Sequence, residues 1–321
     1  RTAPVLTVLL AIEVVVALVV GLANKPSTFF VPEFPALPRL FPDDALFYRE
    51  VADVPTAASS PELVASLGSR PIGAGASGEV RSGVAWGLPF NFVDDTTPRH
   101  EFRMTYPGFS DDVPYPVTDP AYVQSMPSLG IDNHYVGIDL EGRRLWELWA
   151  IRNWFGRWYA GSGGVWDLDS TDQAKGSSTA SGLPMMALTF TYEEVATGSI
   201  DHVLGAATAV SSDNSIWPAR HSDGTSQDPA APPMGTWLRL RADADLSGLG
   251  PQATVIARAM QRYGIVLMDT TSGFGLSGTV DGRWDNADLA TLRTLNTDDL
   301  EVIEQSTLMV DEGSLAARQP G

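Results

Sequence analysis

The chain opens with one long apolar run and continues with short alternations of apolar and polar residues. Residues 5–23 read VLTVLLAIEVVVALVVGLA, apolar or small except for Glu13. A helix of this length covers about 28 Å, close to the hydrocarbon thickness of a bilayer. We therefore expect a transmembrane helix over residues 5–23, behind a flank of residues 1–4. A cleavable signal peptide is the alternative, because residues 21–23 (GLA) have the form of a cleavage site. The length of the run and its acid favour an uncleaved anchor.

Glu13 lies close to the middle of this expected helix. A carboxyl group at the centre of a membrane costs about 2 to 3 kcal/mol, so it is usually protonated, bonded to another helix or turned to a polar cavity. The sequence predicts a single spanning segment, so a partner for Glu13 would come from another subunit, another copy or a cofactor. A neutral Glu13 facing lipid is the alternative.

Regularly spaced prolines predict a semi-rigid, extended arm over residues 24–42, because proline removes backbone donors and favours polyproline II. These prolines are Pro26, Pro32, Pro35, Pro38 and Pro42. Four phenylalanines alternate with them, namely Phe29, Phe30, Phe34 and Phe41. With Glu13, they are the predicted partner-binding residues, at other membrane subunits or the lipid bilayer. Packing of the phenyl rings on the protein's own domain is the alternative.

Residues 43–310 predict a mainly β domain, with a flexible tail over 311–321. Short apolar alternations are separated by Gly, Pro, Asp and Ser clusters, and occur at 135–140, 144–151, 202–210, 236–241, 265–269 and 301–310. This pattern is typical of a β-sandwich or barrel. Three short helices are expected, at 61–67, 251–263 and 287–295; the second has Pro251 in its first turn and Gly264 at its end.

Charge and composition exclude several classes of function. The chain has 21 Lys+Arg against 39 Asp+Glu, a formal net charge of −18, which argues against nucleic-acid binding. It contains no cysteine, which excludes disulfides, thiolate metal sites and iron–sulfur clusters. The acidic domain favours a single-pass protein of the bacterial inner membrane, with a cytoplasmic N-terminus and a periplasmic domain. No cofactor is predicted.

The candidate chemistry centres on Asp132 and His134, a D-x-H pair expected on a strand, where alternate residues share one face. With His221 they could bind a divalent metal or act as an acid/base pair, with Glu147 as a further carboxylate. A structural hydrogen-bonding role is the alternative. A cluster of six aromatic residues fits a sugar platform, a core or an interface, and consists of Trp146, Trp149, Trp154, Trp158, Tyr159 and Trp166. No Walker loop, dinucleotide fingerprint, H-E-x-x-H or G-x-S-x-G motif occurs.

Several segments resemble, in order, a family of exported, β-rich bacterial proteins. They include IDNHYVGID (131–139), RLWELWA (144–150), ASGLPM (180–185), PARH (218–221), PPMGTWLRLRA (232–242), RYGIVLMD (262–269) and DGRWDNADL (281–289). The resemblance covers about residues 41–304. It implies the fold and leaves the reaction open.

The chain departs from this family at polar positions. PIGAGASGEV (71–80) replaces a His-Pro-Asp-Phe-Gly element, and SSTASGLP (177–184) lacks an aspartate of the family. Gln124 and Ser125 replace paired glycines, and Thr270-Thr271 replaces an Asn-Gly. The retained residues are Asp132, His134, Glu147, His202, His221 and Met234. Loss of about half of a polar constellation is expected when a binding or catalytic fold serves as a scaffold.

Two hypotheses follow. In the first, the protein is a non-catalytic accessory subunit on the periplasmic face of a larger membrane complex. An energy-transducing complex, such as a photosynthetic reaction centre with its light-harvesting antenna, is the expected host. In the second, it is a membrane-tethered hydrolase or lyase that acts on envelope polysaccharide through Asp132, His134, Glu147 or His221.

Overall fold

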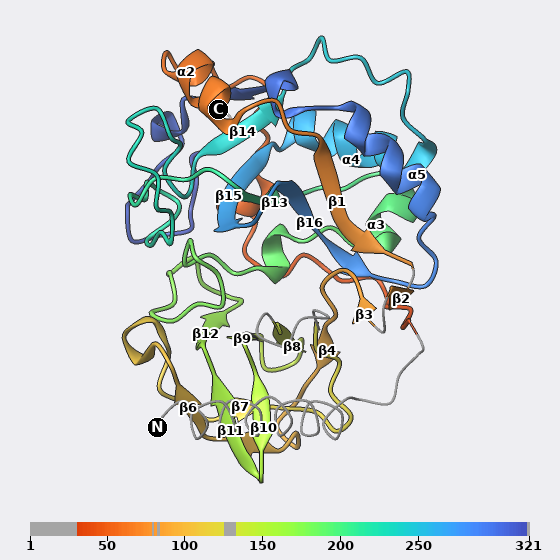
Figure 1. Cartoon of the computed structure of the whole chain (residues 1–321). Helices are drawn as coiled ribbons and strands as arrows, with labels where there is room; N and C mark the ends of the chain where they lie inside the picture. The colour runs from red at the N-terminus through yellow and green to blue at the C-terminus, as the bar shows by residue number, and fades with distance from the viewer. Residues whose placement is uncertain (1–30, 79, 82–83, 125–132, 320–321) are drawn as a thin grey trace, which may run out of the picture.

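The computed structural model describes residues 31–319, apart from 79, 82–83 and 125–132. Its strands form two groups (Figure 1). One end of the molecule holds a six-stranded sheet with most of the helices, and the other end holds a four-stranded and a three-stranded sheet. The predicted fold class, mainly β with a few short helices, is confirmed.

The six-stranded sheet is mixed, and joins strands far apart in the sequence. Its order is β1 (Ile72–Ser77), β16 (Phe274–Val280), β13 (Leu204–Thr208), β15 (Ile265–Thr270), β14 (Trp237–Leu240) and β17 (Leu300–Val302). The pairs β1–β16 and β13–β15 are parallel, whereas β13–β16, β14–β15 and β14–β17 are antiparallel.

The other end of the molecule is built from shorter strands. The four-stranded sheet has the order β12 (Ser162–Asp167), β9 (Arg144–Trp149), β8 (Tyr135–Asp139) and β4 (Asn91–Phe92). The three-stranded sheet has the order β10 (Arg152–Trp154), β11 (Arg157–Ala160) and β6 (Phe102–Met104). Two small ladders pair β2 (Val80–Arg81) with β3 (Val84–Ala85), and β5 (Arg99–His100) with β7 (Tyr115–Pro116).

The α-helices are α2 (Ser60–Leu67), α3 (Tyr192–Thr197), α4 (Pro251–Arg262) and α5 (Asn286–Thr291). The 3-10 helices are η1 (Leu46–Tyr48), η2 (Pro107–Phe109), η3 (Met186–Leu188), η4 (Leu292–Thr294), η5 (Thr297–Asp299) and η6 (Gln305–Thr307). α4 buries Ile256 and Met260 and is followed by Gly264 at φ +79°, as its sequence predicts. The expected third helix divides into α5 and η4, and most of the strand expected at 301–310 is replaced by η6 and loop.

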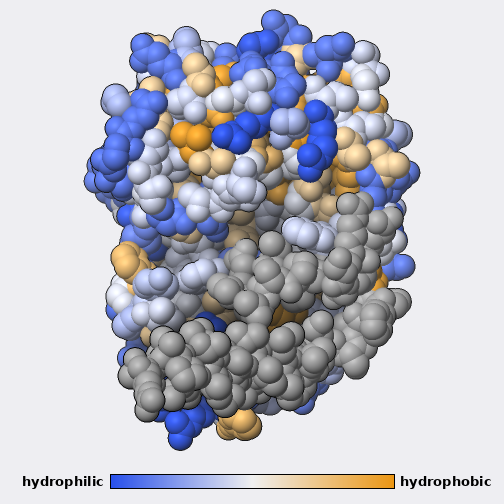
Figure 2. Space-filling view, viewed as in Figure 1, coloured by the Kyte–Doolittle hydropathy of each residue, from blue (hydrophilic) through white to orange (hydrophobic). Residues whose placement is uncertain are grey.

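Three buried clusters hold these layers together. One packs α4, α5 and the six-stranded sheet, and another lies between the four- and three-stranded sheets. The third joins the two ends of the molecule, because Val136 of β8 and Met268 of β15 both belong to it. On the face shown in Figure 2, the residues around the six-stranded sheet are mostly hydrophilic, with hydrophobic residues in small scattered groups.

The transmembrane prediction falls outside the described residues, as do Glu13, Phe29 and Phe30. In the described part of the chain, no helix has the length and apolar character needed to cross a membrane.

The described part of the arm, residues 31–42, belongs to the domain. Phe34 and Phe41 are only 8% and 3% exposed and lie in the central cluster. The Phe34 backbone N–H donates to Asp281 Oδ2 at 3.0 Å. The partner-binding prediction for Phe34 and Phe41 is therefore wrong, because the protein's own core covers both rings.

The C-terminal tail is also part of the domain, and the prediction of a flexible segment is wrong for residues 311–319. Leu315 and Ala317 are buried at 1% and 3% exposure. The Leu46 N–H donates to the Leu315 carbonyl oxygen at 2.7 Å, and the Ala317 N–H donates to the Asp44 carbonyl oxygen at 2.9 Å. Backbone pairing with the segment after the arm holds the tail in place.

A buried ion pair links Glu194 of α3 to His202, two residues before β13. His202 Nε2 lies 3.2 Å from Glu194 Oε1, and His202 Nδ1 lies 2.8 Å from the Val203 carbonyl oxygen. Both ring nitrogens face acceptors, so the imidazolium satisfies both contacts. Burial opposes this charge, but Glu194 outweighs it and the pKa of His202 is raised. The pKa of Glu194 is lowered, because His202 and the Thr191 cap outweigh the opposing effect of burial.

We predict that this pair makes stability depend on pH. Because the pKa of His202 is raised in the folded protein, the ion pair contributes its full stabilisation when the pH is below the unfolded-state pKa of about 6.5. This contribution is lost as the pH rises through the folded-state pKa. The melting temperature should therefore fall between pH 6 and pH 9 by more in the wild type than in His202→Gln. Thermal unfolding of both proteins tests this, and parallel pH profiles would refute the prediction.

Candidate functional site

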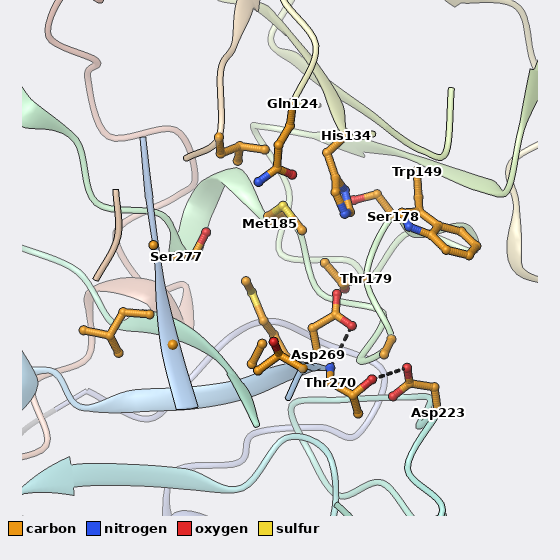
Figure 3. Close-up of a pocket in the computed structure, with 18 of the residues that line it drawn as sticks. Gln124, His134, Trp149, Ser178, Thr179, Met185, Asp223, Asp269, Thr270 and Ser277 are labelled. Atoms are coloured by element: carbon orange, nitrogen blue, oxygen red, sulfur yellow. Dashed lines mark hydrogen bonds between the residues drawn. The ribbon is translucent and has the colours of Figure 1, made fainter. Parts of the chain in front are cut away.

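A cleft of about 890 Å³ separates the six-stranded sheet from the four-stranded sheet. Strands β1, β13, β15 and β16 supply one side of it, and residues near β8, β9 and β12 supply the other. Figure 3 shows Gln124, His134 and Trp149 across the cleft from Asp269 and Thr270. Such volumes are usual for ligand sites, so the cleft is the candidate site.

One row of residues crosses the floor of the cleft on four adjacent strands. Gly73 pairs with Gly275, Gly275 with Ala207, and Ala207 with Asp269. Directly paired residues point to the same face of a sheet, and all four line the cleft. The floor is therefore nearly bare backbone that ends in a carboxylate.

A polar cluster lies at the Asp269 end of this row. The Thr270 N–H donates to Asp269 Oδ1 at 2.8 Å, and the Thr270 hydroxyl donates to Asp223 Oδ2 at 2.7 Å (Figure 3). Asp223 and Thr270 are exposed. The carboxylates of Asp223 and Asp269 can thus accept hydrogen bonds from a ligand in the cleft.

Aromatic rings line another part of the cleft. Tyr106 stacks on Trp149 with ring centroids 6.1 Å apart and planes at 26°. Phe109 meets the His221 ring edge to face at 4.8 Å. Trp86, Tyr106 and Phe109 remain 41%, 49% and 49% exposed. These rings offer apolar surface to a ligand beside polar groups.

Glu147 lies behind the cleft wall with no exposed surface. Its carboxylate accepts the Ser178 hydroxyl at 2.7 Å and the backbone N–H groups of Met185 and Met186 at 2.9 and 2.8 Å. Burial raises the pKa of Glu147, and these bonds oppose the shift. Glu147 fixes the loop that carries Ser178 and Thr179 into the cleft, so its role is structural.

The structure brings His134 and His221 to the same cleft. His134 is 4% exposed and precedes β8, and Asp132 lies outside the described residues. Burial, and then the charge of Arg220, lower the pKa of His221. Among the described residues, no three His, Asp or Glu side chains are placed to hold a metal ion.

The aromatic cluster predicted from the sequence divides among different roles. Trp166 is 1% exposed in the central core, and Trp146 and Trp158 belong to the cluster between the two smaller sheets. Trp149 alone of the six lines the cleft. Sequence analysis missed Asp223, Asp269 and Tyr106; an acid at the end of the apolar run 265–268 was the available signal.

The outer face of the three-stranded sheet is a second distinctive surface. Arg152 pairs with Tyr159 and Tyr159 with Arg103, while Trp154 pairs with Arg157. These five residues share one face, opposite the buried side that carries Phe102 and Trp158. At the hairpin tip, Phe155 is 86% exposed and stacks on Trp154 with centroids 6.0 Å apart. We call this surface, residues 103, 152, 154, 155, 157 and 159, the basic aromatic face.

Comparison with known proteins gave no match to a family model, a curated protein or a solved structure.

Proposed function

We propose that this protein is a non-catalytic, membrane-anchored accessory subunit on the periplasmic face of a larger membrane complex. The basic aromatic face is the observation that carries this proposal. Arginine beside exposed tryptophan and tyrosine is typical of the boundary between membrane and water, where the ring is partly buried and the charge meets headgroups.

Charge distribution supports a specific role for this face. The six residues of this face include three arginines and no acid, in a chain with a net charge of −18. Phe155 adopts φ +51°, an unusual conformation for a bulky side chain, and is almost fully exposed. Within the protein, the exposed Phe155 ring is not buried by packing that would offset this unusual conformation. Contact with anionic headgroups or with a neighbouring subunit would bury the ring and pair the arginines.

The apolar run over residues 5–23 supports the anchor, and Glu13 within it is the proposed contact with another membrane subunit. The anchor and the basic aromatic face together would hold the acidic domain at the bilayer surface. Energy-transducing complexes, such as photosynthetic reaction centres with their antenna, are the hosts we propose, because they take up accessory subunits with single anchors.

The polar residues in and behind the cleft favour a scaffold role over an enzymatic one. Glu147, the carboxylate beside His134, holds backbone and has no exposed surface. The sequence departs from the motifs of the resembled family in four segments, 71–80, 124–125, 177–184 and 270–271. Each segment contributes residues to the lining of this cleft, namely 73–75, 124, 177–180, 270 and 271. Their side chains are absent, small or neutral. The proposed loss of polar groups is thus concentrated in one place.

Replacing the two rings at the hairpin tip should weaken assembly. We predict that the Trp154→Ser/Phe155→Ser variant, purified as the full chain in mild detergent, retains at most about one fifth of the co-purifying subunits, because ~1 kcal/mol of lost contact is a factor of about five. Ile216→Ser/Val310→Ser is the matched control, since both residues are exposed elsewhere on the surface. Equal recovery for wild type and hairpin variant would remove the role of this face.

A further inference from the structure

We infer that the cleft between the two main sheets binds a neutral carbohydrate chain. Three properties of the described residues carry this inference: a floor that is nearly bare backbone, exposed aromatic rings and hydroxyl groups along the wall. It does not rest on the proposed membrane assembly, because a scaffold and a solitary protein could both bind a glycan.

The floor contains two glycines that internal packing does not explain. A Cβ atom on Gly275 would meet only the Gly73 carbonyl oxygen, at 4.0 Å, and one on Gly73 would meet nothing closer than 3.5 Å. Glycine within a strand weakens the strand, and often marks the close approach of a ligand. By contrast, a Cβ on Gly278 would lie 2.4 Å from Phe190, so packing accounts for that glycine. The pair Gly73–Gly275 leaves room for a flat ring against the sheet.

The aromatic rings fit the apolar faces of sugar rings. Pyranose rings carry C–H groups on their faces and hydroxyl groups around their edges, so they pack on flat aromatic surface while their edges bond to polar groups. Trp149 and Tyr106 present such a surface, and Trp86 adds an exposed indole. Sites for small ligands combine apolar contact of this kind with a few placed polar groups.

The polar lining matches a neutral polyol better than an anion. The hydroxyl side chains that line the cleft at exposed or half-buried positions are Ser222, Thr270, Thr271, Ser272 and Ser277. A hydroxyl both donates and accepts, as the groups of a sugar do. Asp223 and Asp269 would accept bonds from sugar hydroxyls and would repel a carboxylate or phosphate. Arg293 lies beside the Gly73 end of the floor, away from these acids in the sheet order.

The size of the cleft indicates more than one sugar unit. Its volume of about 890 Å³ falls in the upper part of the usual range for ligand sites, ~300–1,000 Å³. A short oligosaccharide, or a segment of a longer chain, fits this volume better than a monosaccharide does.

Titration of the full chain in detergent with a panel of neutral hexasaccharides tests the inference. Cellohexaose, maltohexaose, mannohexaose and chitohexaose are the probes, with tryptophan fluorescence as the readout and hexagalacturonate as the anionic comparison. At least one neutral probe should bind with a Kd below about 1 mM. A Kd above about 1 mM for every neutral probe, or tighter binding of hexagalacturonate, would overturn the inference.

A bulky side chain on the floor should weaken this binding. Gly275→Phe places a ring in the cleft without a backbone clash, and should weaken binding at least tenfold. Gly273→Phe is a second plug, because a Cβ there meets nothing within 4 Å. Gly248→Phe is the matched control outside the cleft, where a Cβ would meet only Thr294, at 3.9 Å. Circular dichroism identifies the plug variants that fold, and unchanged affinity in a folded plug variant would place the sugar elsewhere.

Discussion

Glu147→Ala should lower the free energy of unfolding by about 3 to 5 kcal/mol, the largest effect we expect from a single side chain here. The substitution leaves the Ser178 hydroxyl and the N–H groups of Met185 and Met186 without their acceptor. A buried donor that loses its partner costs about 1 to 3 kcal/mol. The cavity left by the side chain adds to this loss.

Urea unfolding followed by circular dichroism measures the effect. Glu141→Ala is the matched control, because Glu141 is exposed in the turn between β8 and β9, and it should change stability by less than about 0.5 kcal/mol. Glu147→Gln should fall between the two, since an amide keeps one acceptor oxygen and turns a donor toward the other N–H groups. A loss below about 1 kcal/mol in Glu147→Ala would contradict the structural role of Glu147.

Asp281→Ala should cost about 3 kcal/mol and release the arm. Asp281 is 1% exposed. It accepts the Phe34 N–H at 3.0 Å, and its two oxygens accept Arg283 Nε and Nη2 at 2.8 and 2.7 Å. Arg283 also donates to the Phe34 carbonyl oxygen at 2.8 Å. Removing the carboxylate therefore breaks the clamp that fixes Phe34, and leaves the half-buried Arg283 guanidinium with Glu193 as its main carboxylate partner.

Limited proteolysis with mass spectrometry should detect faster cleavage within residues 33–40 of Asp281→Ala. Asp213→Ala, at an exposed loop position, is the control and should be cleaved like the wild type. An arm that stays resistant in Asp281→Ala would show that the phenylalanines alone hold it against the domain.

The sequence predicted those helices and strands for which several local signals indicate the same element. Pro251 at the start of α4, its apolar face and Gly264 after it all specify one helix. The apolar alternations gave β8, β9 and β15 within two residues at either end. α3 was missed although Thr191 and Glu194 form a capping box, a signal that the sequence displays.

Other features depended on distant parts of the chain. β1 reads IGAGAS and has little strand propensity of its own; its pairing with β16, about 200 residues later, makes it a strand. The cleft floor also depends on pairing between distant segments. Gly73 and Gly275 have no side chains that a sequence motif could reveal. The phenylalanines of the arm were ambiguous because burial by the protein itself and burial by a partner demand the same residue type.

The structure brings two of the predicted site residues together, while their predicted chemical role stays a prediction. His134 and His221 lie in one cleft, although they are 87 positions apart in the sequence. Glu147 was chosen for its charge, but its position behind the wall follows from the alternation of β9, which sequence alone did not connect to the loop at 178–186. Asp132 lies outside the described residues, so its predicted role remains a prediction.

Quantitative mass spectrometry of the full chain, purified in mild detergent from the membranes of cells that produce it, tests the proposed function most directly. We predict that the protein co-migrates through a density gradient with several membrane subunits, at a fixed molar ratio in every fraction. A solitary monomer, with no partner at constant ratio, would contradict the account of this protein as an accessory subunit.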